Sequence, residues 1–332
     1  MLKVENIKKS YGNNVILKNI NLEIQEGEVY GLIGANGAGK TTLFNIIAQV
    51  LDYDEGGIFI DGKKINTIND LSHKLGYIID IPALFDYMTA FEYLEFIYSP
   101  SNKTKEEIRA RSEEVLAQVG LLEAGNKRIR AFSRGMRQKM GIAAGLIFEP
   151  QIILMDEPSS ALDPIGRREV LHIIQSLKAK GKTIILSTHI LNDIERVCDR
   201  VGLLVDGNIV IEGNLSDVMA NYSENKICVT WSKEDKLKLC QIMQDKKLSK
   251  DFEPKASALE IAYKSKKNKQ EILKAIIESK VEFTDLSLKH KSLEEIFILE
   301  SKNKESEKML ELEENIRLLE ELKSKLQNLG ES

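Results

Sequence analysis

The chain has 332 residues, of which 42% are hydrophobic and 30% are charged, a composition typical of a globular protein with more than one domain. Its formal net charge of −4 gives no electrostatic reason to expect a nucleic-acid partner, because proteins that bind nucleic acids present basic surfaces. The three cysteines, Cys198, Cys228 and Cys240, lack the paired spacing of metal or redox sites, which favours a reducing compartment.

No membrane-spanning helix is expected, because no apolar stretch approaches the roughly 18 residues that a crossing requires. The longest apolar stretch, Gly141–Phe148, is better interpreted as a buried helix. The N-terminus enters a strand-like pattern directly, without the apolar core of a signal peptide.

Residues 1–220 alternate short β-branched runs with amphipathic helical patterns, which predicts an α/β domain with a mainly parallel sheet and helices on both faces. Near the start, Gly12-Asn13-Asn14 between Val4–Tyr11 and Val15–Ile24 predicts an antiparallel β addition at the sheet edge. The predicted buried strands are Val29–Ile33, Ile152–Met155, Thr183–Ser187 and Val201–Val205, and the helices include Glu106–Gln118 and Gly166–Lys180.

Residues 221–300 are predicted to form a small α+β accessory domain, with strands at Lys226–Trp231 and Leu259–Tyr263 and a helix at Lys269–Ser279. Residues 301–332 are expected to be a charged helical tail, whose apolar residues repeat at three- and four-residue steps. That tail is either a solvated helix packed on its own domain or a short coiled coil between two copies. Its apolar positions are Met309, Leu312, Ile316, Leu319 and Leu326, with Lys323 interrupting the seam.

The segment Gly-Ala-Asn-Gly-Ala-Gly-Lys-Thr at residues 34–41 fits the P-loop pattern, and a strand at Val29–Ile33 precedes it. Its glycines let backbone N–H groups turn toward a phosphate, where side chains would clash. Lys40 can reach the β- and γ-phosphates, while Thr41 offers its hydroxyl to Mg²⁺. A helix that begins near Lys40 and continues over Thr42–Val50 directs its positive end at the anion. The sequence therefore predicts a P-loop NTPase core.

Two carboxylates follow the apolar run that ends at Met155, and ligands of such sheets bind at the C-terminal ends of strands. Asp156 is predicted to help hold Mg²⁺, largely through a bound water. Glu157 is predicted to polarise the water that attacks the γ-phosphate.

The segment Phe132-Ser133-Arg134-Gly135-Met136-Arg137-Gln138 resembles the signature motif of ABC ATPases, in the variant form common among bacterial export ATPases. Ser159–Pro164, which includes Asp163, resembles the D-loop of that family, and His189 its switch histidine. Tyr11 occupies the place of the aromatic residue that stacks on adenine. The resemblance covers about residues 1–220 and includes the helical subdomain of that fold.

The resemblance implies an ATPase that works as a homodimer or with another paired ATPase domain, with each ATP between one P-loop and the opposite signature motif. Ser133 and the N–H of Gly135 would complete the partner's γ-phosphate site, and His189 would contact the γ-phosphate and Glu157. The expected catalytic residues are Glu157 and His189, and the expected Mg²⁺ residues are Thr41, Asp80 and Asp156. The expected ATP-binding residues are Tyr11, Gly34, Asn36, Gly37, Ala38, Gly39, Lys40, Thr41, Thr42, Ser133, Gly135 and Asp163.

Simpler interpretations exist for several of these residues when each is taken alone. Tyr11 could pack on a neighbouring strand, Ser133 could cap a helix, and Asp163 could be an ordinary turn acid. Asp80 stands where many family members carry glutamine, and its shorter carboxylate leaves Mg²⁺ coordination open. The aromatic residues of Leu84–Thr89 resemble a surface that meets a membrane partner, or else pack the helical subdomain.

The segments Gly207–Gly213 and Ser292–Phe297 resemble the tail region of ATPases from drug, antibiotic-peptide and sodium efflux systems. We therefore expect an ATPase on the cytoplasmic face of the membrane that powers export through a separate transmembrane permease. One alternative is a regulatory ATPase that signals through a membrane partner without net transport. Another is a soluble translation-associated ATPase, although such chains normally carry two P-loops.

Overall fold

The computed structural model describes residues 1–71, 73–222, 226–231, 241, 252–254, 258–279, 282–289 and 292–303. Contacts divide these residues into two compact units, one running to Leu215 and the other spanning Ser216–Leu299. The predicted tail at 301–332 lies outside the described residues except for its first three positions, which are helical. Over the described part of the chain, every helix is too short or too polar to cross a membrane.

The centre of the first unit is a six-stranded sheet in the order β10-β9-β3-β8-β7-β6. Its strands from β9 to β6 run parallel, and β10 pairs antiparallel with β9, so the predicted mainly parallel sheet is confirmed. Every residue of the three central strands is buried, which explains their continuous apolar runs. The strands are β3 (Val29–Ile33), β6 (Leu75–Ile78), β7 (Ile152–Asp156), β8 (Thr183–Thr188), β9 (Arg200–Val205) and β10 (Asn208–Asn214).

The antiparallel part forms a sheet of its own in the order β2-β1-β4-β5, where the sequence predicted only an addition at the edge of the parallel sheet. Its strands are β1 (Leu2–Tyr11), β2 (Asn14–Ile24), β4 (Glu55–Ile60) and β5 (Lys63–Ile65). Alternate residues of β1 and β2 point into a core shared with β3, β7 and the helix α1 (Lys40–Ile47). This second sheet packs over α1 and shares a core with it. The contact joins residues that are far apart in the sequence, so the local hydrophobic pattern does not predict it.

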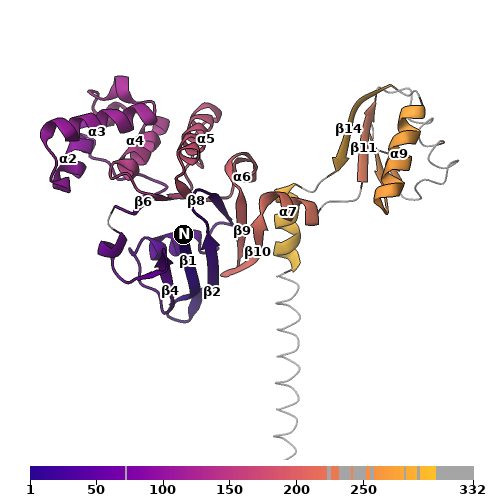
Figure 1. The fold of residues 1–332 in the computed structure, drawn as a ribbon, viewed down its shortest axis with the longest axis horizontal. Helices are drawn as coiled ribbons and strands as arrows, with labels where there is room; N and C mark the ends of the chain where they lie inside the picture. The colour runs from indigo at the N-terminus through magenta and orange to yellow at the C-terminus, as the bar shows by residue number, and fades with distance from the viewer. Residues whose placement is uncertain are drawn as a thin grey trace, which may run out of the picture. The chain divides into compact units, whose positions relative to one another are not determined.

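Helices α2 (Ala90–Tyr98), α3 (Lys105–Gln118) and α4 (Arg134–Leu146) form a helical subdomain beside β6. Figure 1 shows them on the opposite side of β6 from β1, β2 and β4. Thr89 and Thr104 start the first two helices with capping boxes, in which the threonine hydroxyl accepts from the backbone N–H of the glutamate three residues later and that glutamate's carboxylate accepts from the threonine N–H. The remaining helices of this unit are α5 (Pro164–Ala179) and α6 (Leu191–Val197), and 3₁₀ turns lie at Ile68–Leu71, Ser99–Ser101, Leu122–Ala124 and Ile129–Ala131.

The second unit holds an antiparallel sheet in the order β12-β13-β11-β14, with helix α9 packed on one face. Its described strands are β11 (Lys226–Trp231), β12 (Phe252–Pro254), β13 (Ala258–Ala262) and β14 (Phe283–Lys289), and its helices are α7 (Leu215–Asn221) and α9 (Lys266–Glu278). Residues 293–303 are also helical. The core of this unit consists of Ile227, Val229, Leu259, Ile261, Ile272, Ala275 and Ile276.

Candidate active site

The P-loop connects β3 to α1, and its backbone requires glycine at a defined position. Gly39 has a φ of 107° and caps α1, and a Cβ there would lie 2.8 Å from the Leu17 side chain. Gly37 also has a positive φ, of 82°, but a Cβ there would meet nothing within 4 Å. The loop is therefore fixed against the core at Gly39 and open at its tip, where Ala35 and Asn36 are exposed.

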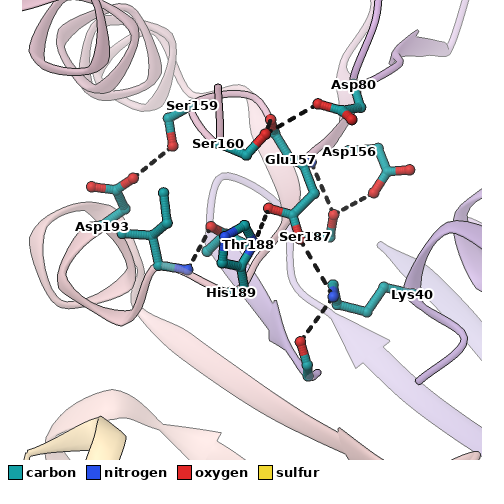
Figure 2. A network of polar contacts seen from close by, with 12 residues as sticks. Lys40, Asp80, Asp156, Glu157, Ser159, Ser160, Ser187, Thr188, His189 and Asp193 are labelled. Atoms are coloured by element: carbon teal, nitrogen blue, oxygen red, sulfur yellow. Dashed lines mark hydrogen bonds and ion pairs between the residues drawn. The ribbon is translucent and has the colours of Figure 1, made fainter. Parts of the chain in front are cut away.

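Three charged or titratable side chains converge at the mouth of this loop, as Figure 2 shows. Lys40 Nζ lies 3.4 Å from Glu157 Oε1 and donates to the carbonyl oxygens of Gly34 at 2.8 Å and Ala35 at 3.2 Å. His189 Nδ1 lies 2.9 Å from Glu157 Oε2. Lys40 is 6% exposed and Glu157 13% exposed, so the carboxylate is held between a buried ammonium and an imidazole that reaches solvent.

Asp156 and Glu157 are both connected to Ser187, the residue beside them on β8. The Ser187 hydroxyl donates to Asp156 Oδ1 and accepts from the Glu157 N–H at 3.0 Å, and that N–H is also 3.1 Å from the Ser187 carbonyl oxygen. Glu157 has a φ of 47°, a left-handed conformation that costs a non-glycine residue about 1–3 kcal/mol. The bonds from Ser187 hold the Glu157 backbone in that conformation and thereby direct its side chain toward Lys40.

Asp80 lies in the loop after β6, where its Oδ1 accepts a hydrogen bond of 3.1 Å from the Ser160 hydroxyl. Ser160 belongs to the loop that follows Glu157, so this bond connects Asp80 to that loop. Asp80 also lines a cavity of about 280 Å³, whose other lining residues include Glu157 and Gln138. The Asp80 carboxylate is therefore near the predicted base, but it contacts the loop after Glu157 and not the P-loop.

The side chain of Tyr77 connects β6 to α1 through a hydrogen bond of 3.1 Å to Asn45 Oδ1. Burial raises the pKa of the Tyr77 phenol well above its usual value, and the nearby Asp156 carboxylate raises it further. Tyr77 therefore stays neutral and acts as a hydrogen-bond donor beneath the site.

The remaining predicted residues lie at helix and strand ends. Ser133 accepts from the Met136 N–H at 3.2 Å and caps α4, and Asp163 accepts from the Gly166 N–H at 2.7 Å and caps α5. Tyr11 ends β1 with its ring 53% exposed. Within the described residues, no hydrogen bond or ion pair joins these side chains to the P-loop of the same chain. The capping role left open for Ser133 is thus observed, and Asp163, for which the sequence offered only a turn, is also an N-cap. Both residues are exposed.

Sequence reasoning missed the buried polar residues that join the loops of the site. Ser159 donates a hydrogen bond of 2.6 Å to Asp193 on α6, and Arg167 on α5 donates one of 2.7 Å to the same carboxylate. Ser187 was assigned only as the end of a strand. The available signal for Ser187 is a polar residue near the C-terminal end of an apolar strand, whereas no local pattern marks Ser159, Asp193 and Arg167 as partners.

Comparisons with known proteins agree with this geometry. The ABC transporter family model matches residues 17–160, and a model for the C-terminal domain of DrrA1-3-like ATP-binding proteins matches residues 213–300. The lantibiotic transport ATP-binding protein SrtF of Streptococcus pyogenes is 38% identical over 212 residues, which are 64% of this chain and 90% of SrtF. The chain belongs to the ABC transporter ATP-binding proteins. The linearmycin resistance protein LnrL of Bacillus subtilis is 35% identical over 68% of this ABC ATPase and 73% of LnrL.

Solved structures show the same cassette. The structure of cbiO1 from Clostridium perfringens, part of an ABC transporter complex, has a TM-score of 0.62 and 31% identity over 66% of this ABC ATPase and 90% of cbiO1. A dimeric ATP-binding cassette with bound ADP and phosphate has a TM-score of 0.59 and 31% identity, covering 65% and 99% of the two chains. This ABC ATPase is therefore the ATP-binding, ATP-hydrolysing subunit of an ABC transporter.

Proposed function

We propose that this subunit hydrolyses ATP at the Lys40 site to power export through a separate membrane permease, from the cytoplasmic face of the membrane. The convergence of Lys40, Glu157 and His189 at the open mouth of the P-loop carries the catalytic part of this proposal. Export of a drug or antibiotic peptide is supported by the similarity of residues 213–300 to DrrA1-3-like proteins. It is also supported by the similarity to SrtF, a lantibiotic transport protein, and to LnrL, a linearmycin resistance protein.

Each member of the convergent group has a chemical role toward ATP. The P-loop N–H groups and the Lys40 ammonium would hold the phosphates, because Lys40 lies against the loop carbonyls and the tip of the loop is exposed. Glu157 would accept the proton of the attacking water as general base. The His189 imidazole, hydrogen-bonded to Glu157, would orient that carboxylate and contact the γ-phosphate.

The oxygen-rich residues near the P-loop suit Mg²⁺, an ion that prefers oxygen ligands and keeps several waters. Thr41 follows Lys40 and is exposed, while the Asp156 carboxylate is held in place by Ser187 at the end of β7. When bound with ATP, Mg²⁺ would neutralise charge on the phosphate oxygens. Asp80 would join these Mg²⁺ ligands only after its hydrogen bond with Ser160 breaks, so its contribution to Mg²⁺ binding depends on that bond.

A second copy of the chain would complete each site. Ser133 and Arg134 are exposed at the start of α4, and a Cβ at Gly135 would meet nothing within 4 Å. Backbone N–H groups at this helix N-terminus attract anions, so the surface suits the γ-phosphate bound by a partner subunit. In that dimer Asp163 and Tyr11, both exposed, would border the nucleotide.

The groove between β6 and α4 is proposed as the contact with the permease. It has a volume of about 660 Å³ and a mainly apolar lining that includes the exposed side chains of Val50, Ile68 and Ile79. At one end, Phe85 packs at 5.8 Å from Tyr93 and stacks at 5.9 Å on Tyr87, whose ring is exposed. These aromatic residues therefore pack the helical subdomain and also present an apolar surface for a short helix of the membrane partner.

The export proposal is tested by recovering tagged Glu157→Gln protein from detergent-solubilised native membranes with Mg-ATP. A polytopic membrane protein recovered in stoichiometric amount is expected, and a Val50→Asp/Ile79→Asp variant should lose it while retaining ATP binding. Recovery of ribosomes, or of no membrane protein, would contradict the proposal. The catalytic part is tested by turnover, which Glu157→Gln should lower by about 10²- to 10⁴-fold.

A further inference from the structure

Glu157 and His189 stand on two different loops, and their contact requires that those loops keep a fixed separation. Glu157 begins the loop between β7 and α5, and His189 begins the loop between β8 and α6. The 2.9 Å contact between their side chains involves a histidine that is 47% exposed, so that contact alone is weakly protected from solvent. Other contacts must set the distance between the loops.

At the strand end of the two loops, Ser187 supplies one such contact. Its hydroxyl and carbonyl oxygen both accept from the Glu157 N–H, which joins β8 to the first residue of the Glu157 loop. This contact fixes the backbone where the two loops leave the sheet.

At the far end of the loops, Asp193 supplies the second contact. Asp193 Oδ2 accepts a hydrogen bond of 2.6 Å from Ser159, two residues after Glu157, and Asp193 itself lies four residues after His189. Its other oxygen accepts a charge-assisted bond of 2.7 Å from Arg167 Nε on α5. Asp193 is 1% exposed and Ser159 2% exposed, so water does not compete for either group.

We propose that Asp193 is a positioning residue, whose buried carboxylate joins the Glu157 loop to the helix after His189 and so keeps the predicted base and its orienting imidazole in contact. Figure 2 shows the Ser159–Asp193 pair on one side of the Glu157–His189 contact and Ser187 on the other. The charge-assisted bond from Arg167 anchors the same carboxylate to α5, and charge-assisted bonds are about twice as strong as neutral ones. This inference rests on the roles proposed above for Glu157 and His189.

The contacts predict which kinetic quantity changes. Among the described residues, neither Ser159 nor Asp193 contacts the P-loop, so the affinity for ATP should be retained when their bond is removed. A displacement of a catalytic group by about 1 Å can lower a rate by about 100-fold. We therefore expect Asp193→Leu and Ser159→Ala to lower kcat by about 10- to 100-fold, with less than about a threefold change in the Kd of an ATP analogue.

Conservative and combined variants separate positioning from a general structural role. In Asp193→Asn, the amide oxygen still accepts from Arg167, and the amide N–H can donate to the Ser159 hydroxyl in a bond of reversed direction, so kcat should return to within about fivefold of wild type. The Ser159→Ala/Asp193→Leu double variant should be no slower than the slower single variant, because both remove the same bond. Glu195→Gln, an exposed carboxylate-to-amide change on the same helix, is the matched control and should retain wild-type kcat.

The deciding experiment measures steady-state ATPase activity and analogue binding of the full-length purified chain, with the folded fraction of each variant taken from its binding stoichiometry. Asp193→Leu should lower kcat in the wild-type background and leave the residual rate of Glu157→Gln unchanged. Wild-type kcat in both Asp193→Leu and Ser159→Ala, or a further loss in the Glu157→Gln background, would overturn the inference. If Glu157→Gln itself turned over normally, the proposed base would be wrong instead.

Discussion

Removing the Glu157 carboxylate is expected to change ATP affinity as well as turnover, because Lys40 is paired with that carboxylate in this structure. Their charged atoms lie 3.4 Å apart, and both side chains are largely buried. Coulomb's law with an effective dielectric constant of about 20 gives an attraction of about 5 kcal/mol at that separation. Desolvation of the two charges cancels much of it, so we expect a net coupling of about 1–3 kcal/mol.

A bound phosphate must compete with Glu157 for the Lys40 ammonium. It also places further negative charge beside the Glu157 carboxylate, which repels it. Glu157→Gln should therefore bind ATP more tightly. The net Lys40–Glu157 coupling of about 1–3 kcal/mol corresponds to an increase in affinity of about 5- to 150-fold. Measured without nucleotide, the variant should be less stable by about 1–3 kcal/mol, which lowers the melting temperature by about 2–12 °C. Lys40→Met should weaken ATP binding, since it removes the cation that neutralises the phosphates.

The assay combines calorimetric titration with a non-hydrolysable ATP analogue and thermal unfolding of the wild type, both single variants and the double variant. The control pair is Lys8–Glu55, 2.7 Å apart with both side chains exposed, whose removal should cost less than about 1 kcal/mol and leave analogue binding unchanged. If Glu157→Gln bound the analogue no more tightly than wild type, the argument that Glu157 competes with phosphate for Lys40 would be refuted.

Three further changes have defined outcomes. Asp80→Asn should raise the Mg²⁺ concentration needed for half-maximal ATPase activity while leaving nucleotide binding without Mg²⁺ unchanged; an unaltered Mg²⁺ dependence would exclude Asp80 from the metal site. Gly56→Ala should destabilise the protein by at least about 2 kcal/mol in urea unfolding, because Gly56 has a φ of 109° and a Cβ there would approach the Glu5 carbonyl oxygen within 2.4 Å. The bond from the Thr104 N–H, helped by Lys103, lowers the pKa of Glu107 below its usual value of 4.5. The stability that Glu107 contributes should therefore be present above pH 4.5 and lost as pH falls through its lowered pKa, so the stability difference between wild type and Glu107→Gln should vanish in acid.

Local elements follow from local patterns, and here the sequence predicted them closely. The bounds of β3 and β11 agree with the predicted strands to the residue. The helix α1 begins at Lys40, where the sequence predicted its start, whereas α5 begins earlier than expected, at Pro164 and not Gly166. In α5 the reason is chemical, since Asp163 is a good N-cap and proline suits the first helical position.

The order of P-loop, signature motif, paired acids and histidine was enough to predict the fold and the ATPase family, because each motif is a short run whose chemistry depends on adjacent residues. The sequence alone also predicted a parallel sheet, from apolar strands alternating with amphipathic helices. Only the tertiary structure showed that β1, β2, β4 and β5 form a separate sheet over α1.

The structure alone also decided the partners of the charged residues. Glu157 is paired with Lys40, Asp80 with Ser160, and Asp193 with Ser159 and Arg167. These partners are far apart along the chain and meet because the segments after β3, β6, β7 and β8 leave the sheet at the same edge. Periodic patterns record which face of an element is buried, but hydrogen-bond partners depend on the register between elements, which no short stretch of sequence contains.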